Sequence, residues 1–144
     1  MRKDNLLEDL LLREDNRGEN CKVCVALSKL YSADRPISAR AYAMKAKRLG
    51  AEDLPIPSKS RDEIPESDSA GSYLLGKELC EMEQYEEALP YLEAAGHSKD
   101  HTVAAMASLY LADLLSYHST ADPKVISSWY RRAAKLGNPD LLEG

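Results

Sequence analysis

Two pairs of residues in the sequence are of types that bind zinc. Cys21 and Cys24 are separated by two residues, and His97 and His101 are separated by three. Thiolate and imidazole groups at such spacings form tetrahedral zinc sites. The two pairs, however, are separated by about 70 residues, far outside the spacing of a zinc finger. Because Cys24 also falls on the apolar face of an expected helix, we predict free cysteines and no bound metal.

No pattern for nucleophilic catalysis is recognisable. Such catalysis needs a base within reach of a serine or cysteine, and a group that orients the base. The three histidines, His97, His101 and His118, all lie in the second half of the chain. Neither the G-x-S-x-G motif nor a glycine-rich nucleotide loop is present. The sequence therefore predicts a protein that is not an enzyme and needs no cofactor.

The overall composition narrows the class further. The 144 residues fit one domain, and the net charge of -5 argues against nucleic-acid binding, since little counterion release would drive it. No run approaches the roughly 18 apolar residues that a membrane span needs, and Asp4, Glu8 and Asp9 interrupt the leucines of a possible signal peptide. An odd number of cysteines does not suggest disulfides. We expect a cytoplasmic protein that binds no membrane.

Helical periodicity dominates, and no segment alternates with a period of two. Proline and glycine mark the boundaries: Pro36 breaks the chain, Gly50 ends a helix, and Asp122-Pro123 begins one. The segment 51–68 contains three prolines and few apolar residues, so we expect a linker or surface loop. A first, N-terminal helix is expected within 1–18, ending near Gly18. The later helices are expected over about 20–32, 38–49, 69–82, 84–95, 101–117 and 123–137.

An internal repeat connects these helices. Residues 38–53 match residues 127–140, and 87–96 match more loosely. The equivalent alanines Ala46, Ala95 and Ala133 lie 49 and 38 residues apart. We expect a single domain, 1–144, with the N-terminal helix 1–18, repeats over 19–50, 69–100 and 101–137, the proline-rich segment 51–68 between the first two, and a C-terminal cap over 138–144.

The repeat resembles two known families of helical repeat. The stretch WYRRAAKLGNPD, residues 129–140, is similar to the junction of Sel1-like repeats. The middle unit is similar to a tetratricopeptide repeat at six positions: Leu75, Gly76, Leu79, Ala88, Leu92 and Ala95. This resemblance implies an all-α fold of about six or seven helices, in which antiparallel pairs stack as a short right-handed solenoid.

The resemblance also predicts how the helices pack. Gly76 and Ala88 are small enough for a close approach, and the larger Leu75, Leu79, Tyr91 and Leu92 would fill the space around them. Ser28 takes the place of the glycine in the first unit. In the third unit Asp113-Leu114 replaces the Leu-Gly pair and Ile126 replaces the small alanine, so we expect a wider contact. At least one of Trp129 and Tyr130 is expected to pack between helices.

In solenoids of this kind the first helix of each unit lines the concave surface, where partners lie. The resemblance therefore implies nine partner-binding residues: Lys22, Val25 and Lys29, then Tyr73, Lys77 and Glu81, then Leu111, Leu115 and His118. Three of them, Lys22, Lys29 and Lys77, form a hypothetical basic stripe for an acidic segment or a C-terminal carboxylate. Plain solvated lysines are the alternative.

The function implied is a protein-protein interaction module, either an adaptor or a chaperone-like or immunity-like protein that binds a partner protein or peptide on its concave face. The alternative is a self-associating structural protein that forms homo-oligomers. It is favoured by five leucines near the N-terminus, more than a capping helix requires: Leu6, Leu7, Leu10, Leu11 and Leu12.

Overall fold

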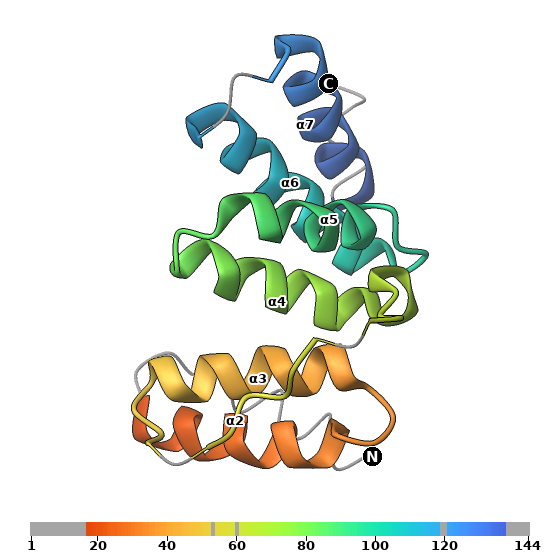
Figure 1. Ribbon diagram of the computed structural model, residues 1–144. Helices are drawn as coiled ribbons and strands as arrows, with labels where there is room; N and C mark the ends of the chain where they lie inside the picture. Colours follow the sequence, from red (N-terminus) through yellow and green to blue (C-terminus); the bar gives the residue numbers. More distant parts are fainter. Residues whose placement is uncertain (1–16, 53, 60, 119–120, 138–144) are drawn as a thin grey trace. The chain divides into compact units, whose positions relative to one another are not determined.

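The computed structural model describes residues 17–52, 54–59, 61–118 and 121–137, and over these ranges the protein is all-α (Figure 1). The elements are α2 (Arg17–Tyr31), α3 (Pro36–Arg48), the short 3-10 helix η1 (Pro65–Asp68), α4 (Ser69–Glu81), α5 (Tyr85–Gly96), α6 (His101–His118) and α7 (Pro123–Gly137). The all-α prediction is confirmed. The C-terminal cap and all but the last two residues of the expected N-terminal helix lie outside the described residues.

One predicted helix boundary is wrong. Gly18 was expected to end a helix, but it lies in the first turn of α2, which runs from Arg17 to Tyr31. Glycine at this position is tolerated because the first turn of a helix has few intrahelical hydrogen bonds to weaken.

The contacts within the chain define two compact units, Met1–Glu63 and Ile64–Gly144. The single domain expected from the sequence stays a prediction. The boundary falls inside the proline-rich segment 51–68. The described residues of this segment contain no α-helix, and the segment ends in the 3-10 helix η1, directly before α4. Unit 1 therefore contains α2 and α3, and unit 2 contains η1 and α4 to α7.

Unit 1 is an antiparallel pair of helices joined by a short turn (Figure 1). Pro36 occupies the first turn of α3, where its missing N–H costs nothing. Gly50 ends the helix as predicted, with a φ of 121°, and the N–H of Ala51 returns to the carbonyl of Ala46 at 2.9 Å. The core between the two helices includes the fully buried Leu27 and Ile37.

A buried ion pair attaches the following segment to α3. The guanidinium of Arg40 donates to both carboxylate oxygens of Glu63, at 2.6 and 2.8 Å. The side chains are only 10% and 3% exposed. Residues 54–59 and 61–63 pass across α3 in Figure 1, and this bidentate pair fixes their end.

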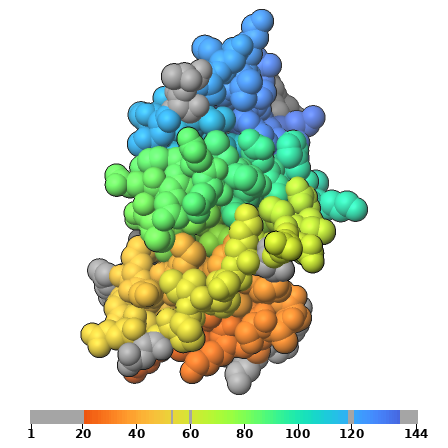
Figure 2. Space-filling view, viewed as in Figure 1, coloured from red at the N-terminus to blue at the C-terminus, as the bar shows by residue number. Residues whose placement is uncertain are grey.

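Unit 2 consists of two helix pairs, α4 with α5 and α6 with α7. Helix α6 also contacts α4 and α5, so the four helices share one core. Its largest fully buried side chains are Leu75, Leu92 and Leu111. In the space-filling view, the atoms of α4 to α7 form one continuous surface, as expected where side chains fill the space between helices (Figure 2).

The predicted packing of the middle unit is confirmed. A Cβ added to Gly76 would lie 2.7 Å from both Cγ and Cδ2 of Leu92, so only glycine fits without a shift. Ala88 is fully buried against it. The larger residues expected around this contact, Leu75, Leu79, Tyr91 and Leu92, are all buried.

Helix α7 packs against the end of α5. The ring of Trp129 covers Gly96, where an added Cβ would lie 2.7 Å from Cζ3 of the indole. The Nε of Arg132 donates to the Gly96 carbonyl at 2.7 Å, which caps the negative end of α5. Of the pair Trp129 and Tyr130, at least one of which was expected to pack between helices, it is Trp129 that does so. No residue of α7, including the half-buried Ile126, is completely buried.

The register of the third repeat must be corrected. Most buried residues of α4 have a buried counterpart in α6 when Leu75 is aligned with Leu111. Gly71, Ser72, Leu75, Gly76 and Glu78 in α4 then correspond to Ala107, Ser108, Leu111, Ala112 and Leu114 in α6. The Leu-Gly pair of α4 therefore has its counterpart in Leu111-Ala112. The predicted counterpart, Asp113-Leu114, lies two residues too late.

Candidate functional site

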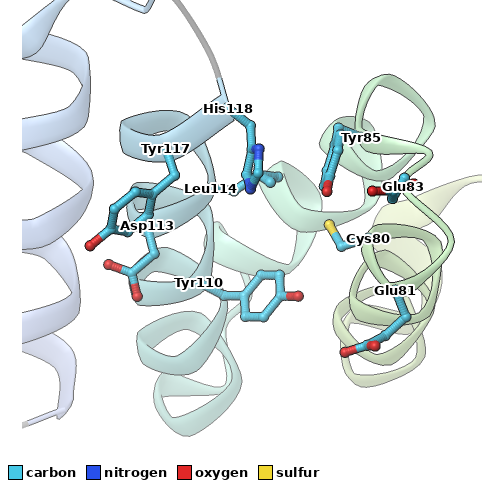
Figure 3. Close-up of a pocket in the computed structure, with 9 residues that line it drawn as sticks. All are labelled: Cys80, Glu81, Glu83, Tyr85, Tyr110, Asp113, Leu114, Tyr117 and His118. Carbon is cyan, nitrogen blue, oxygen red and sulfur yellow. The ribbon is translucent and has the colours of Figure 1, made fainter.

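The candidate site is a depression of about 430 Å³ in unit 2, between the end of α4, the turn into α5 and the last turns of α6 (Figure 3). We call it the tyrosine pocket. Nine residues line it: Cys80, Glu81, Glu83, Tyr85, Tyr110, Asp113, Leu114, Tyr117 and His118. An adjoining depression shares four of these residues and continues along α5 past Glu86 and Leu89.

The turn between α4 and α5 positions one side of the pocket. The N–H of Glu83 bonds to the Cys80 carbonyl and that of Gln84 to the Leu79 carbonyl, both at 2.9 Å. This is the paired hydrogen-bond pattern of a helix that ends in a left-handed residue. Glu83 is that residue, with a φ of 59°. Glycine is usual here, so the chain accepts local strain while placing a carboxylate at the pocket edge.

Aromatic rings from three elements meet in and beside the pocket. Tyr73 of α4 meets Tyr110 of α6 edge to face, with centroids 6.3 Å apart and planes at 87°. The rings of Tyr85 and His118 stack at 4.4 Å, with an angle of 13° between planes. In Figure 3 these two rings face each other at the top of the pocket. Such contacts hold the helices and the rings in one geometry.

Lys77 lies next to these rings. Its Nζ is 5.1 Å from the centroid of Tyr73 and 5.9 Å from that of Tyr110. Both distances fall within the range of a cation-π interaction. Lys77 is thus a half-buried lysine that packs on tyrosine, which differs from a fully solvated one.

The thiol of Cys80 and the hydroxyl of Tyr110 form a hydrogen bond between α4 and α6. Burial raises the pKa of Cys80, the hydrogen bond from Tyr110 lowers it, and the nearby Glu81 raises it again. The net shift is upward. The pKa of Tyr110 is also raised, first by burial and then by Cys80. At neutral pH both groups keep their protons, so Cys80 is a hydrogen-bonding thiol and a poor nucleophile.

The carboxylates of the pocket differ in their partners. Asp113 accepts a hydrogen bond of 2.6 Å from the hydroxyl of Tyr130 on α7. This bond raises the pKa of Tyr130. Glu81 and Glu83 are exposed and form no ion pair with any residue of the described ranges. The pocket can therefore offer two carboxylates to a ligand, together with phenol rings and hydroxyl groups.

The structure brings together most of the site residues predicted for unit 2. Glu81 and His118 line the pocket, Leu115 lines the adjoining depression, and Tyr73 and Lys77 lie beside them. Leu111 is a correction. It is fully buried and belongs to the core, because the expected alignment of α6 was two residues out of register.

The three residues predicted in the first repeat lie in unit 1. Lys22 and Lys29 are exposed on α2, and Val25 is half-buried. They share one side of α2 by their spacing.

Seven residues of the pocket were not predicted from the sequence: Cys80, Glu83, Tyr85, Tyr110, Asp113, Leu114 and Tyr117. Asp113 and Tyr117 are the counterparts of Lys77 and Glu81 in the corrected register of α6. Pairing Gly76 with the small residue Ala112 would have found them. The position of Glu83 depends on its left-handed backbone conformation, which the sequence does not indicate because the residue is not glycine.

The residues considered for zinc are not gathered. Cys21 donates to the Ala46 carbonyl at 3.5 Å, and Cys24 is buried in the core of unit 1. His97 packs beside Trp129 in unit 2, with ring centroids 5.2 Å apart. Within the part of the chain that the structure describes, no three residues of the types His, Cys, Asp and Glu could hold a metal ion.

None of the helices in the described ranges combines the length and the apolar character needed to cross a bilayer. Comparisons with family models, with curated proteins and with solved structures give no match to this chain. The likeness to Sel1-like and tetratricopeptide repeats therefore stays a prediction, and the functional argument depends on the geometry of unit 2.

Proposed function

We propose that this protein is a protein-protein interaction module and that unit 2 binds its partner at the tyrosine pocket. The observation that carries the proposal is the exposure of Tyr117, a residue at the rim of the pocket, 80% of whose surface is open. A large aromatic side chain left this open on a rigid helix is typical of a residue that is covered on binding.

The construction of the pocket supports binding over chemistry. Tyrosine supplies apolar area and a hydroxyl group while losing little conformational entropy, which is why it is enriched in protein interfaces. The rings come from α5 and α6, which are fixed by the shared core of unit 2. A partner would therefore meet a surface that is already arranged, which reduces the entropic cost of association.

Site-specific photo-crosslinking tests the proposal. The full chain would carry benzoylphenylalanine in place of Tyr117, and a control chain would carry it in place of Glu93, an exposed residue of α5 outside the pocket lining. Irradiation in the native cell should give discrete protein adducts from position 117 that are absent from position 93. The additional change Tyr85→Ala should reduce them. Equal adducts from both positions, or none from 117, would refute the proposal.

Self-association is a second candidate, favoured by two exposed apolar side chains on α6. Met106 and Leu109 are 42% and 49% exposed and lie three residues apart, so they share a side of the helix. Sedimentation over a hundredfold range of concentration separates the two functions. A dimer weakened by Leu109→Ser would favour self-association, whereas a monomer throughout would exclude it.

A further inference from the structure

We infer that the tyrosine pocket receives an arginine side chain from a basic segment of the partner protein. This inference rests on the proposed function, and it adds the charge and the chemical group that the pocket selects. The inferred charge of the partner segment is opposite to the one expected from the sequence, where a stripe of lysines suggested an acidic segment.

The charge of the pocket is the first argument. Three acidic residues line it, Glu81, Glu83 and Asp113, and neither a lysine nor an arginine is among its lining residues. The carboxylate of Asp113 is bonded to Tyr130 on α7, so Glu81 and Glu83 are the two that a ligand can reach. Two more, Glu86 and Glu87, line a shallow depression that continues from Glu83 along α5. Glu81 and Glu83 have no ion-pair partner in the described ranges. A cationic group of the partner protein could therefore form ion pairs with their carboxylates.

The position of Lys77 is the second argument. Its ammonium group lies over the rings of Tyr73 and Tyr110, so the protein already holds one cation against this aromatic surface. Tyr110 also lines the pocket. Lys77 contributes one positive charge beside these rings, against the two carboxylates of Glu81 and Glu83, so the charge of the pocket residues stays negative.

The shape of the groups favours guanidinium over ammonium. Glu81 lies on α4, and Tyr110 of α6 points toward it in Figure 3, while Tyr85 and His118 stand above them. A planar guanidinium can stack on a phenol ring and at the same time donate to a carboxylate through two N–H groups. A lysine ammonium is a strongly hydrated point charge and would lose more water for fewer fixed contacts.

Three short peptides test the inference on the full chain. They are acetylated and amidated, and have the sequences GSRLRSG, GSKLKSG and GSELESG. Each is titrated into isotope-labelled protein and followed by amide chemical shifts. The arginine peptide should shift the amides of Glu81, Glu83, Tyr110 and Tyr117, with a Kd at least about tenfold lower than that of the glutamate peptide and below that of the lysine peptide.

A matched pair of charge variants identifies the carboxylates responsible. Glu81→Gln with Glu83→Gln should weaken the arginine peptide about tenfold or more. Glu66→Gln with Glu93→Gln removes the same charge from exposed residues outside the pocket lining and should change the Kd less than about twofold.

The outcomes separate the inference from the proposed function. If the glutamate peptide binds the same amides as tightly as the arginine peptide, or if both variant pairs lose affinity equally, the arginine inference is overturned while a binding pocket remains. If no peptide shifts these amides, the inference is also overturned, and adducts from position 117 then decide the proposed function alone.

Discussion

The hydroxyl of Ser28 donates a hydrogen bond of 3.0 Å to the carbonyl oxygen of Ala39, across the two helices of unit 1. The equivalent contact in unit 2 joins Gly76 and Ala88, where an added Cβ would lie 3.5 Å from the Ala88 carbonyl oxygen. In both helix pairs a small residue of the first helix therefore lies against a carbonyl group of the second. In unit 1 the gap admits a hydroxyl group, and in unit 2 Leu92 fills it.

Gly76→Ala should destabilise unit 2. The new methyl group would lie 2.7 Å from two atoms of the fully buried Leu92, and overpacking of this kind costs roughly 1–3 kcal/mol. The gain in helix propensity, about 1 kcal/mol, offsets only part of this. Urea unfolding followed by the fluorescence of Trp129, the single tryptophan of the chain, should show a lower midpoint.

Gly137→Ala is the matched control for that change. A Cβ at Gly137 meets only the Cβ of Ala105, at an ordinary 3.4 Å. Its midpoint should equal or exceed that of the unchanged protein. If the two alanine variants unfold at the same urea concentration, contact with Leu92 is not the reason that position 76 requires glycine.

Ser28→Ala should destabilise unit 1 by about 1 kcal/mol, since it removes a buried hydrogen bond and leaves a small gap. Hydrogen exchange of peptides from α2 and α3 should show faster exchange, with little change in α6 and α7. Ser32→Ala provides the comparison, because the hydroxyl of Ser32 bonds to the Lys29 carbonyl at 2.9 Å on the exposed surface. An equal effect of both changes would contradict the importance assigned to the buried bond.

The sequence predicted the helices of this protein well, for reasons that are local. Pro123 fits the first turn of a helix and Gly50 fits a left-handed end, so the start of α7 and the end of α3 follow from residue type. The start of α3 was expected at residue 38, but the helix begins at Pro36, which was expected to break the chain. The packing at Gly76 could also be predicted from the sequence. Glycine destabilises the interior of a helix, so its presence there indicates a close contact that a larger side chain would prevent.

The candidate site was predicted only in part, because the register of α6 is not evident from its sequence. Apolar residues surround this helix: Val103, Met106, Leu109, Leu111 and Leu114 point in several directions. Helical periodicity therefore does not identify the buried side. Burial shows that Leu111-Ala112 face the core, which places Asp113 and Tyr117 at the rim of the pocket with their side chains on the side of α6 that faces α7 (Figure 3). The division into two units depends on long-range contacts that no local pattern contains.

Breaking the ion pair between Arg40 and Glu63 should strongly destabilise unit 1. Glu63→Leu leaves a guanidinium that is only 10% exposed without its carboxylate, and losing one member of a buried pair costs roughly 3–5 kcal/mol. Circular dichroism in urea should show earlier loss of helix. The double change Arg40→Met with Glu63→Leu should cost less than the sum of the single changes, because no charge is left buried. Additive losses would contradict this coupling.

The reactivity of Cys80 should report its hydrogen bond to Tyr110. Alkylation by iodoacetamide requires the thiolate, so its rate rises with pH through the pKa of the thiol. Mass spectrometry resolves Cys80 from Cys21 and Cys24. Because burial raises the pKa of Cys80 above its usual 9.0, the midpoint of its rate profile should lie above pH 9.

Tyr110→Phe should move that midpoint to still higher pH, since the hydroxyl of Tyr110 lowers the pKa of Cys80 by donating to the thiolate. Tyr73→Phe, which changes a ring beside Tyr110, serves as the control and should leave the midpoint unchanged.

The raised pKa of Cys80 also has a consequence for the stability of the protein. The buried neutral thiol contributes fully below pH 9, and its contribution is lost as the pH rises through the pKa of the folded state, because the unfolded chain then releases the proton first. A midpoint below pH 9, or one that Tyr110→Phe lowers, would show that Cys80 is an activated thiolate and would reopen the question of chemistry at this pocket.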